Sequence, residues 1–330
     1  MLFAACSSSL EQMRLEGGLD GIPHYRFDNL SYLQLFNVRA YVTEFLELLS
    51  NCPNLTDLQL FHPKICEGGA NDDYIFSLPN LRRLRIEIHP SVLAASLISK
   101  IPLSTSVATQ IYAIMDDVPQ EFLEAISQLP IMQATATVAI SSKVIIAVTD
   151  VSGIRGPCSL MQALPMQQIR ELWVYGPENH SRVDHCPTLL PFLVKLEVLV
   201  LCDTLQLDQV LDALAPPGNI KSRPVCPKLH TVRIIMTKNP WTAPSVFQRV
   251  AERQPQLQLS RFSCHWIPTY SDFFRTSYES EYGHLFPTTE LDVKLLDHDG
   301  LARMKVPDAC LADEDNNWPS MLRGPTHTLL

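Results

Sequence analysis

The sequence predicts an α/β solenoid, in which short parallel strands form an inner sheet and helices cover its outer side. Three observations support this prediction: a leucine phrase that recurs along the chain, helical patterns between its copies, and a proline before several of them. At 330 residues the chain is long for one compact domain but ordinary for an elongated array. We expect about nine irregular repeats arranged as a horseshoe.

The recurring phrase is L-x-x-L-x-L, with other aliphatic residues allowed. Its x-L-x-L-x part alternates as a half-buried strand does, so these leucines point together into the core. One such strand cannot bury its apolar face alone, and neighbouring copies must stack. Where consecutive copies are clear, they start 20, 25, 26, 27 and 33 residues apart, which matches the long end of the 20–29 residues usual for the leucine-rich repeat. They begin at Leu10, Leu30, Leu55, Leu81, Ile169, Leu196 and Leu229.

The register is not clear between the copies at Leu81 and Ile169. The 88 residues between these two starts leave room for two weaker repeats. The candidates are "ATQIYAI" at 108–114 and "QATATVAI" at 133–140. The apolar run "KVIIAVTD" follows the second candidate at once and breaks the period, so we assign no register there.

Helical patterns fill the segments between the phrases. Residues 39–51, 118–130 and 245–255 place apolar side chains on one helical face. Prolines stand two residues before the leucine at four positions, where they are expected to end a helix and lead the chain into a strand. These prolines are Pro53, Pro79, Pro227 and Pro255.

Cysteines stand beside these turns, and a small apolar side chain packs well beneath a turn. We therefore interpret Cys52, Cys186 and Cys226 as structural residues. The nine cysteines of the chain include no C-x-x-C pair, which indicates reduced thiols in a cytoplasmic or nuclear protein.

The phrases "NCPNLTDLQL", "LPNLRRLRIE" and "CPKLHTVRII" resemble the irregular leucine-rich repeats of F-box proteins, especially the fungal type. The resemblance covers roughly residues 1–262. In that family an F-box binds the adaptor of a cullin–RING ubiquitin ligase, and the repeats hold the substrate. No F-box segment is expected here, because Leu10 already opens a repeat and the chain begins inside the array. Adaptor and cullin are expected partners only if an F-box lies upstream.

Composition argues against two classes of partner. Hydrophobic residues make up 46% of the chain and charged residues 18%, which is ample for a core. The net charge is −9 and no basic stripe is readable, so nucleic acid is not an expected partner. No apolar run approaches the length of a membrane span. We expect a non-catalytic protein-binding function with a protein substrate or partner.

An enzyme, either a hydrolase or a transferase with an unrecognised site on the repeats, is the alternative. Phosphate-binding glycine loops, a nucleophile elbow and H-E-x-x-H are all missing from the sequence. His180, Asp184, His185 and Cys186 cluster in one loop, but the two histidines lack a second ligand pair of recognised spacing. Residues 295–300, "LLDHDG", lack the remaining positions of a calcium loop. We expect no catalytic residue, cofactor or metal.

The predicted binding surface is formed by the strand residues that alternate with the buried leucines. They face outward on the sheet, on the concave side with which solenoids bind partners. Aromatic residues and arginine, which dominate binding hot spots, are frequent among them. Aromatic residues are, however, also common in strands that have no binding role. The alternation also places Gln110 and Ile114 outward. The predicted partner-binding residues are Tyr32, Gln34, Phe36, Asp57, Gln59, Phe61, Arg83, Arg85, Glu87, Tyr112, Glu171, Trp173 and Tyr175.

The domain boundaries follow from these patterns. We expect the solenoid over 1–262, an aromatic-rich C-terminal cap over 263–306, and an acidic, disordered tail over 307–330. Val198, Val200 and Cys202 sit at outward strand positions, where an exposed apolar strip is unfavourable. The aromatic segment 264–286 is therefore expected to cover this strip or to cap the last repeat.

Overall fold

The structure is a computed structural model of the chain. The described residues are 9–18, 25–66, 77–113, 118–140, 144–175, 186–202, 207–215, 225–236, 243–266, 282–295, 304 and 307–311. The chain forms two compact units. Unit 1 contains residues 1–135, 145–165 and 306–324, and unit 2 contains 136–144, 166–305 and 325–330.

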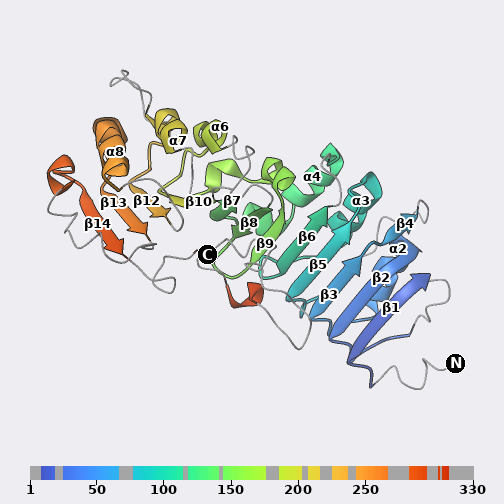
Figure 1. The fold of residues 1–330 in the computed structure, drawn as a ribbon. Coiled ribbons are helices and arrows are strands. Elements are labelled where there is room, and N and C mark those ends of the chain that lie inside the picture. Colours follow the sequence, from blue (N-terminus) through green and yellow to red (C-terminus); the bar gives the residue numbers. More distant parts are fainter. Residues whose placement is uncertain are drawn as a thin grey trace. The chain divides into compact units, whose positions relative to one another are not determined.

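The sheet of unit 1 places its strands in the order β1-β2-β3-β5-β6-β9-β8, and β4 pairs with the end of β2 (Figure 1). Neighbours from β1 to β6, and β6 with β9, pair in parallel. The strands are β1 (Gln12–Gly18), β2 (Tyr32–Tyr41), β3 (Asp57–Phe61), β4 (Lys64–Cys66), β5 (Arg83–Ile88), β6 (Ala108–Ala113), β8 (Val144–Val148) and β9 (Gly153–Pro157).

The sheet of unit 2 has the order β7-β10-β11-β12-β13-β14, and all of these neighbours pair in parallel. The strands are β7 (Thr137–Ile140), β10 (Glu171–Tyr175), β11 (Val198–Cys202), β12 (Thr231–Met236), β13 (Arg261–Trp266) and β14 (Glu290–Leu295). The chain therefore has an α/β fold with mostly parallel, open sheets, and the predicted α/β class is confirmed.

Helices follow the strands in both units and bury their apolar faces. The predicted segments 39–51 and 118–130 contain α2 and α4, and 245–255 lies within α8. Unit 1 contains α2 (Val42–Ser50), α3 (Val92–Lys100), α4 (Gln120–Ser127), α5 (Pro130–Gln133) and the 3-10 helix η1 (Cys158–Ala163). Unit 2 contains η2 (Met166–Gln168), α6 (Cys186–Leu189), η3 (Leu190–Phe192), α7 (Leu207–Leu214), α8 (Ala243–Leu257) and η4 (Gly283–Leu285).

The entry into successive strands repeats the same backbone hydrogen bonds. In unit 1 the N–H groups of Thr56 and Asp57 both donate to the Ser31 carbonyl, at 2.8 and 3.0 Å. Arg82 and Arg83 then donate in the same way to Thr56, one repeat later. The pattern recurs in unit 2, where the N–H groups of residues 197 and 198 donate to the carbonyl of residue 170. This recurrence shows that the copies of the leucine phrase stack in register.

The prolines before the leucines lie in tight turns. The Leu55 N–H donates to the Cys52 carbonyl at 3.2 Å, so Pro53 is the second residue of the turn. Proline is favoured there because its ring fixes the φ angle that the turn needs. Leu81 and Leu229 close equivalent turns around Pro79 and Pro227.

Pro255 differs from the other three prolines, and the prediction that it ends a helix is wrong. It lies inside α8, which continues to Leu257. A proline removes its own N–H from the helix and crowds the carbonyl four residues earlier, but the helix still continues past it, and the Gln258 N–H donates to the Gln254 carbonyl at 2.9 Å. The helix ends where Gln258 adopts a left-handed conformation with a φ of 51°.

The strands continue beyond residue 262, where we expected the repeats to end. The expected boundary falls inside β13, and β14 pairs with it, with Phe262 opposite Leu291 and Cys264 opposite Val293. The turn before β14 again has a proline in second position, because the Thr289 N–H donates to the Phe286 carbonyl around Pro287. Residues 263–266 and 290–295 therefore add strands to the sheet. Residues 267–281, which hold most of the aromatics of the predicted cap, lie outside the described residues.

Part of the predicted tail is ordered against unit 1. Asp308–Cys310 forms the 3-10 helix η5, and the Cys310 side chain is fully buried. A Cβ atom added at Gly153 of β9 would lie 3.1 Å from the Cys310 Sγ, so the two residues are in close contact. The expectation of disorder is therefore incorrect for residues 308–310.

Candidate functional site

The register of unit 1 aligns the predicted binding residues in three rows that run across the strands. The leucines between them, such as Leu58 and Leu60, are buried in the core, so these rows lie on the opposite face, which we call the helix-free face. The middle row, here called the Arg-Gln row, contains Arg14, Gln34, Gln59, Arg85, Gln110 and Arg155. One outer row contains Glu16, Phe36, Phe61, Glu87 and Tyr112, and the other contains Gln12, Tyr32, Asp57, Arg83 and Ala108.

Arg85 lies between two aromatic rings of the neighbouring strands. Its Cζ atom is 4.7 Å from the centroid of the Phe61 ring and 5.1 Å from that of Tyr112. Such contacts attract the cation to the ring faces and hold the guanidinium in place. The Arg85 side chain is 21% exposed, and one terminal nitrogen lies 3.9 Å from a Glu87 oxygen. Its Nε is buried and makes no hydrogen bond.

The aromatic contacts extend from Phe61 toward β1. The Phe36 and Phe61 centroids lie 6.2 Å apart, and the His62 ring meets Phe36 edge-on at the same distance. The Arg14 Cζ lies 6.0 Å from the Phe36 centroid. The His62 Nε2 is 3.2 Å from a Glu87 oxygen. These half-exposed side chains form one connected surface over four strands.

Buried polar groups form the base of this surface. Asp57 is 3% exposed and forms an ion pair with Arg83 of the next strand. Burial raises the pKa of Tyr32, and the neighbouring Asp57 carboxylate raises it further. Arg155 is 2% exposed, and its desolvation lowers the pKa of its guanidinium.

The structure changes the accessibility of several predicted binding residues. Tyr32, Asp57 and Gln59 are buried, so the side chains within a partner's reach are the remaining seven in unit 1. These seven are Gln34, Phe36, Phe61, Arg83, Arg85, Glu87 and Tyr112.

The three predicted residues in unit 2 lie on β10, and Trp173 is not exposed as expected. It is 2% exposed, its Nε1 donates to the Glu171 Oε1 at 2.7 Å, and its ring stacks on Tyr175 at 6.3 Å. Burial raises the pKa of Tyr175, and Cys202 and Glu171 raise it further. Val200 and Cys202, in the next strand, are buried as well. The prediction that Trp173 faces outward to a partner is thus corrected: it is a core residue of unit 2.

Sequence reasoning missed three residues of the surface in unit 1. Arg14 occupies the outward position of the first leucine phrase, so the same alternation would have found it. His62 directly follows β3 and has a φ of 50°, which the pattern does not predict. Arg155 lies on β9, where no leucine phrase marks the register.

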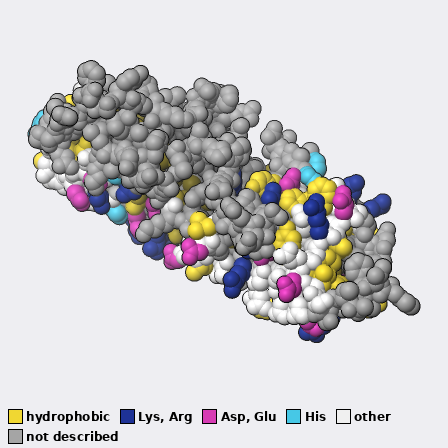
Figure 2. Space-filling model, turned by 60° about the horizontal axis from the view of Figure 1, so that its bottom comes forward, with side chains coloured by type: hydrophobic (Ala, Val, Ile, Leu, Met, Phe, Trp, Pro, Cys, Tyr) yellow, Lys and Arg dark blue, Asp and Glu magenta, His cyan; other side chains and the backbone are white. Residues whose placement is uncertain are grey.

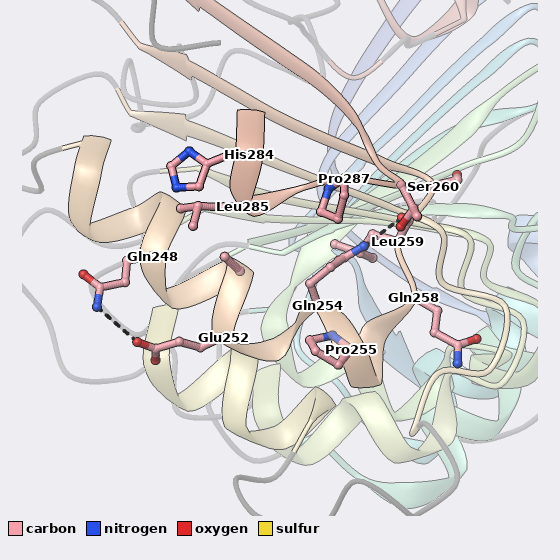
Figure 3. A pocket seen from close by; sticks show the side chains of 12 residues that line it. Gln248, Glu252, Gln254, Pro255, Gln258, Leu259, Ser260, His284, Leu285 and Pro287 are labelled. Carbon is pink, nitrogen blue, oxygen red and sulfur yellow. Dashed lines mark hydrogen bonds between the residues drawn. The ribbon is translucent and has the colours of Figure 1, made fainter. Parts of the chain in front are cut away.

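A pocket of about 880 Å³ lies in unit 2, between α8 and η4 (Figure 3). The Gln248 Nε2 donates to the Glu252 Oε1 at 3.3 Å, and Figure 3 shows the His284 ring apart from that bond. The lining residue Ser260 donates its hydroxyl to the His230 carbonyl at 3.2 Å. Among the described lining residues, no nucleophile is hydrogen-bonded to a base, which an acyl-transfer site would require.

The described cysteines are consistent with structural roles. The Cys52 Sγ donates to the Leu48 carbonyl at 3.2 Å, and the Cys226 Sγ donates to the Leu190 carbonyl at 3.3 Å. Burial raises the pKa of Cys52, Cys186 and Cys226 to about 12, so these thiols stay protonated.

In the part of the chain that the structure describes, no three His, Cys, Asp or Glu side chains come together as metal ligands do. His180, Asp184 and His185, and residues 296–300 of the calcium-like phrase, lie outside that part. Likewise, none of the described helices combines the length and the apolar character of a membrane span.

Comparison with known proteins gives no relative: neither a family model nor a curated protein matches the sequence.

Proposed function

We propose that the chain is a leucine-rich-repeat solenoid that acts as a non-catalytic protein-interaction module and binds its partner with the helix-free face of unit 1. The observation that carries this proposal is the Phe61–Arg85–Tyr112 sandwich, because aromatic residues and arginine contribute most to binding hot spots. The stacked leucine phrases and their recurring hydrogen bonds support the solenoid. Figure 2 shows acidic, basic and hydrophobic side chains side by side on one face of the molecule.

Within this class, the substrate-binding part of an F-box-like ubiquitin-ligase receptor is the specific function we propose. The support is the likeness of "NCPNLTDLQL" and "LPNLRRLRIE" to the repeats of that family. In this function the repeats hold the substrate, and an F-box encoded upstream would supply the adaptor contact.

Site-specific crosslinking tests the interaction surface. A photoreactive phenylalanine would replace Phe61 in one variant and Val92 in a second. Val92 belongs to α3 and is 60% exposed, so it serves as a control on another surface. In extract of the source cells, irradiation should attach a discrete partner at position 61 and not at 92. Equal products at both positions, or none at 61, would contradict the proposal.

Affinity purification tests the ligase function. The chain and a form extended with its upstream coding sequence would be purified from source cells, followed by mass spectrometry. Adaptor and cullin should accompany the extended form only. If neither form recovers them, the chain is not part of such a ligase, although a protein-binding function would stand.

A further inference from the structure

We propose that residues 307–311, which contain η5, form a displaceable cover on the helix-free face of unit 1. The protein partner must remove this cover to bind the whole face, so the segment restrains binding within the chain itself. This inference rests on the proposed function and adds a regulatory step to it.

The segment lies on the same face as the proposed binding surface. Gly153 and Arg155 alternate on β9 with the buried Ile154, and Arg155 belongs to the Arg-Gln row. A Cβ atom at Gly153 would therefore point to the helix-free face, where it would lie 3.1 Å from the Cys310 Sγ. η5 also packs beside β6 (Figure 1). The C-terminal segment thus occupies the β6–β9 end of this face.

The three arginines of the Arg-Gln row become less exposed toward η5. Arg14 on β1 is exposed, Arg85 on β5 is half-buried, and Arg155 on β9 is buried. A buried guanidinium is costly because it loses its hydration, and desolvation lowers the pKa of Arg155 accordingly. An apolar side chain would suit a permanently covered position better. An arginine there is compatible with a surface that is uncovered when a partner binds.

The contact that holds the segment is small. η5 is a single turn of three residues. Cys310 is fully buried, but Asp308 before it and Leu311 after it are exposed. A short segment with few buried side chains opens at a much lower free energy than the core of a unit. The segment can therefore detach while the sheet of unit 1 stays folded.

A partner that covers the sandwich around Arg85 would reach this segment. Tyr112 of the sandwich donates its hydroxyl to the Gln110 Oε1 at 3.3 Å, and Gln110 lies opposite Arg155 in the register. From Tyr112 to the level of Gly153 is four residues along the strands, or about 13 Å. A standard interface buries about 800 Å² on each partner, which corresponds to a patch about 30 Å across. A patch of this size centred on the sandwich overlaps η5.

Thiol labelling of the wild-type chain tests whether the cover opens. Cys310 and Cys52 are both fully buried, and burial raises the pKa of each to about 12. A difference in their reaction rates therefore reports opening rather than acidity. With iodoacetamide under native conditions, mass spectrometry should show Cys310 reacting at least a hundredfold faster than Cys52. Equal rates would mean that η5 opens only when unit 1 unfolds, which would overturn the inference.

Crosslinking tests whether the cover hinders the partner. The photoreactive phenylalanine at position 61 would be combined with Cys310→Arg, because an arginine has no room against Gly153, or with Leu311→Arg as the control. Leu311 is 42% exposed, so its substitution adds the same charge without displacing η5. In extract of the source cells, the yield of crosslink should rise at least threefold with Cys310→Arg and stay unchanged with Leu311→Arg. An unchanged yield with Cys310→Arg would overturn the inference.

A measurement without any change in η5 covers the case in which Cys310→Arg fails to fold, as judged by circular dichroism. In the crosslinked product of the chain with an unaltered C-terminal segment, Cys310 should be labelled faster than in the free chain, because the partner has displaced η5. Equal or slower labelling in the product would overturn the inference.

The two proposals fail in distinguishable ways. A crosslink at position 61 whose yield does not respond to Cys310→Arg would retain the interaction surface and reject the cover. Absence of a crosslink at position 61, with and without Cys310→Arg, would reject the surface itself.

Discussion

Replacing Phe247 by alanine should destabilise unit 2 by about 3–5 kcal/mol, the usual range for a buried phenylalanine. The side chain is fully buried on α8. Its ring lies 5.7 Å from that of Phe262, 5.1 Å from that of Tyr282 and 6.4 Å from that of Phe286. The truncation would therefore open a cavity that three rigid neighbours cannot easily close.

The assay is equilibrium urea unfolding followed by circular dichroism, with slopes compared to confirm the same transition. Phe192→Ala is the control, because that side chain is 60% exposed and its loss should change stability by less than about 0.5 kcal/mol. Phe247→Ala combined with Phe286→Ala should show a coupling of about 0.5–1.5 kcal/mol. A loss below about 1 kcal/mol for Phe247→Ala would mean that the ring is not core. Strict additivity would mean that Phe286 does not pack on it.

Three further predictions concern the base of the surface, the C-terminal segment and the thiols. Arg83→Ala should destabilise unit 1 by about 3 kcal/mol, because it leaves the buried Asp57 without its cation; thermal melts should show no such loss for Arg82→Ala. Gly153→Ala should destabilise by about 1–3 kcal/mol, since its Cβ would lie 2.8 Å from Val148 Cγ1 and 3.1 Å from Cys310 Sγ. In a double-mutant cycle, Gly153→Ala should destabilise the Cys310→Gly variant less than it destabilises the wild type. If the two effects were strictly additive, η5 would not contact Gly153. Stability should fall above pH 9, because the unfolded chain loses thiol protons that the folded chain retains up to a pKa of about 12. Each thiol should lower the free energy of unfolding by about 1.4 kcal/mol per pH unit. Urea titrations at pH 9–11 should show a slope that is smaller by this amount in Cys52→Ala. An unchanged slope would refute the thiol origin.

The sequence predicted the features of the fold that have local causes. Leu58 and Leu60 alternate with polar residues and therefore indicate a strand, and Pro53 indicates the turn before it. Local signals are weaker where the structure departs from the pattern. β14 was missed although Leu291, Val293 and Leu295 alternate, because Thr289 stands where the earlier turns have a leucine. Pro255 misled because a helix near its end can lose one N–H bond and continue.

The candidate site was predictable only in part, because exposure depends on tertiary contacts. Alternation correctly placed Phe61, Arg85 and Tyr112 on one face of neighbouring strands. It did not reveal that Trp173, at the corresponding strand position, is fully enclosed. The burial of Cys310 likewise depends on a contact with Gly153, which lies more than 150 residues earlier in the chain.

The middle outward position of the strands carries both apolar and polar residues. Unit 1 has Gln59 and Arg85 there, and unit 2 has Trp173 and Val200 on β10 and β11 and Arg233, Ser263 and Asp292 on β12 to β14. Apolar residues at this position are compatible with the fold, as Trp173 and Val200 show by their burial. Polar side chains are unfavourable there unless they form hydrogen bonds within the protein or with a partner, because burial removes their hydrogen bonds to water. Local departures from the most stable choice are expected at functional sites. Gln34 and Gln110 meet this condition within unit 1, because they accept hydrogen bonds from the Tyr32 and Tyr112 hydroxyls. Arg85, held between Phe61 and Tyr112, is the part of this face for which we propose a protein partner.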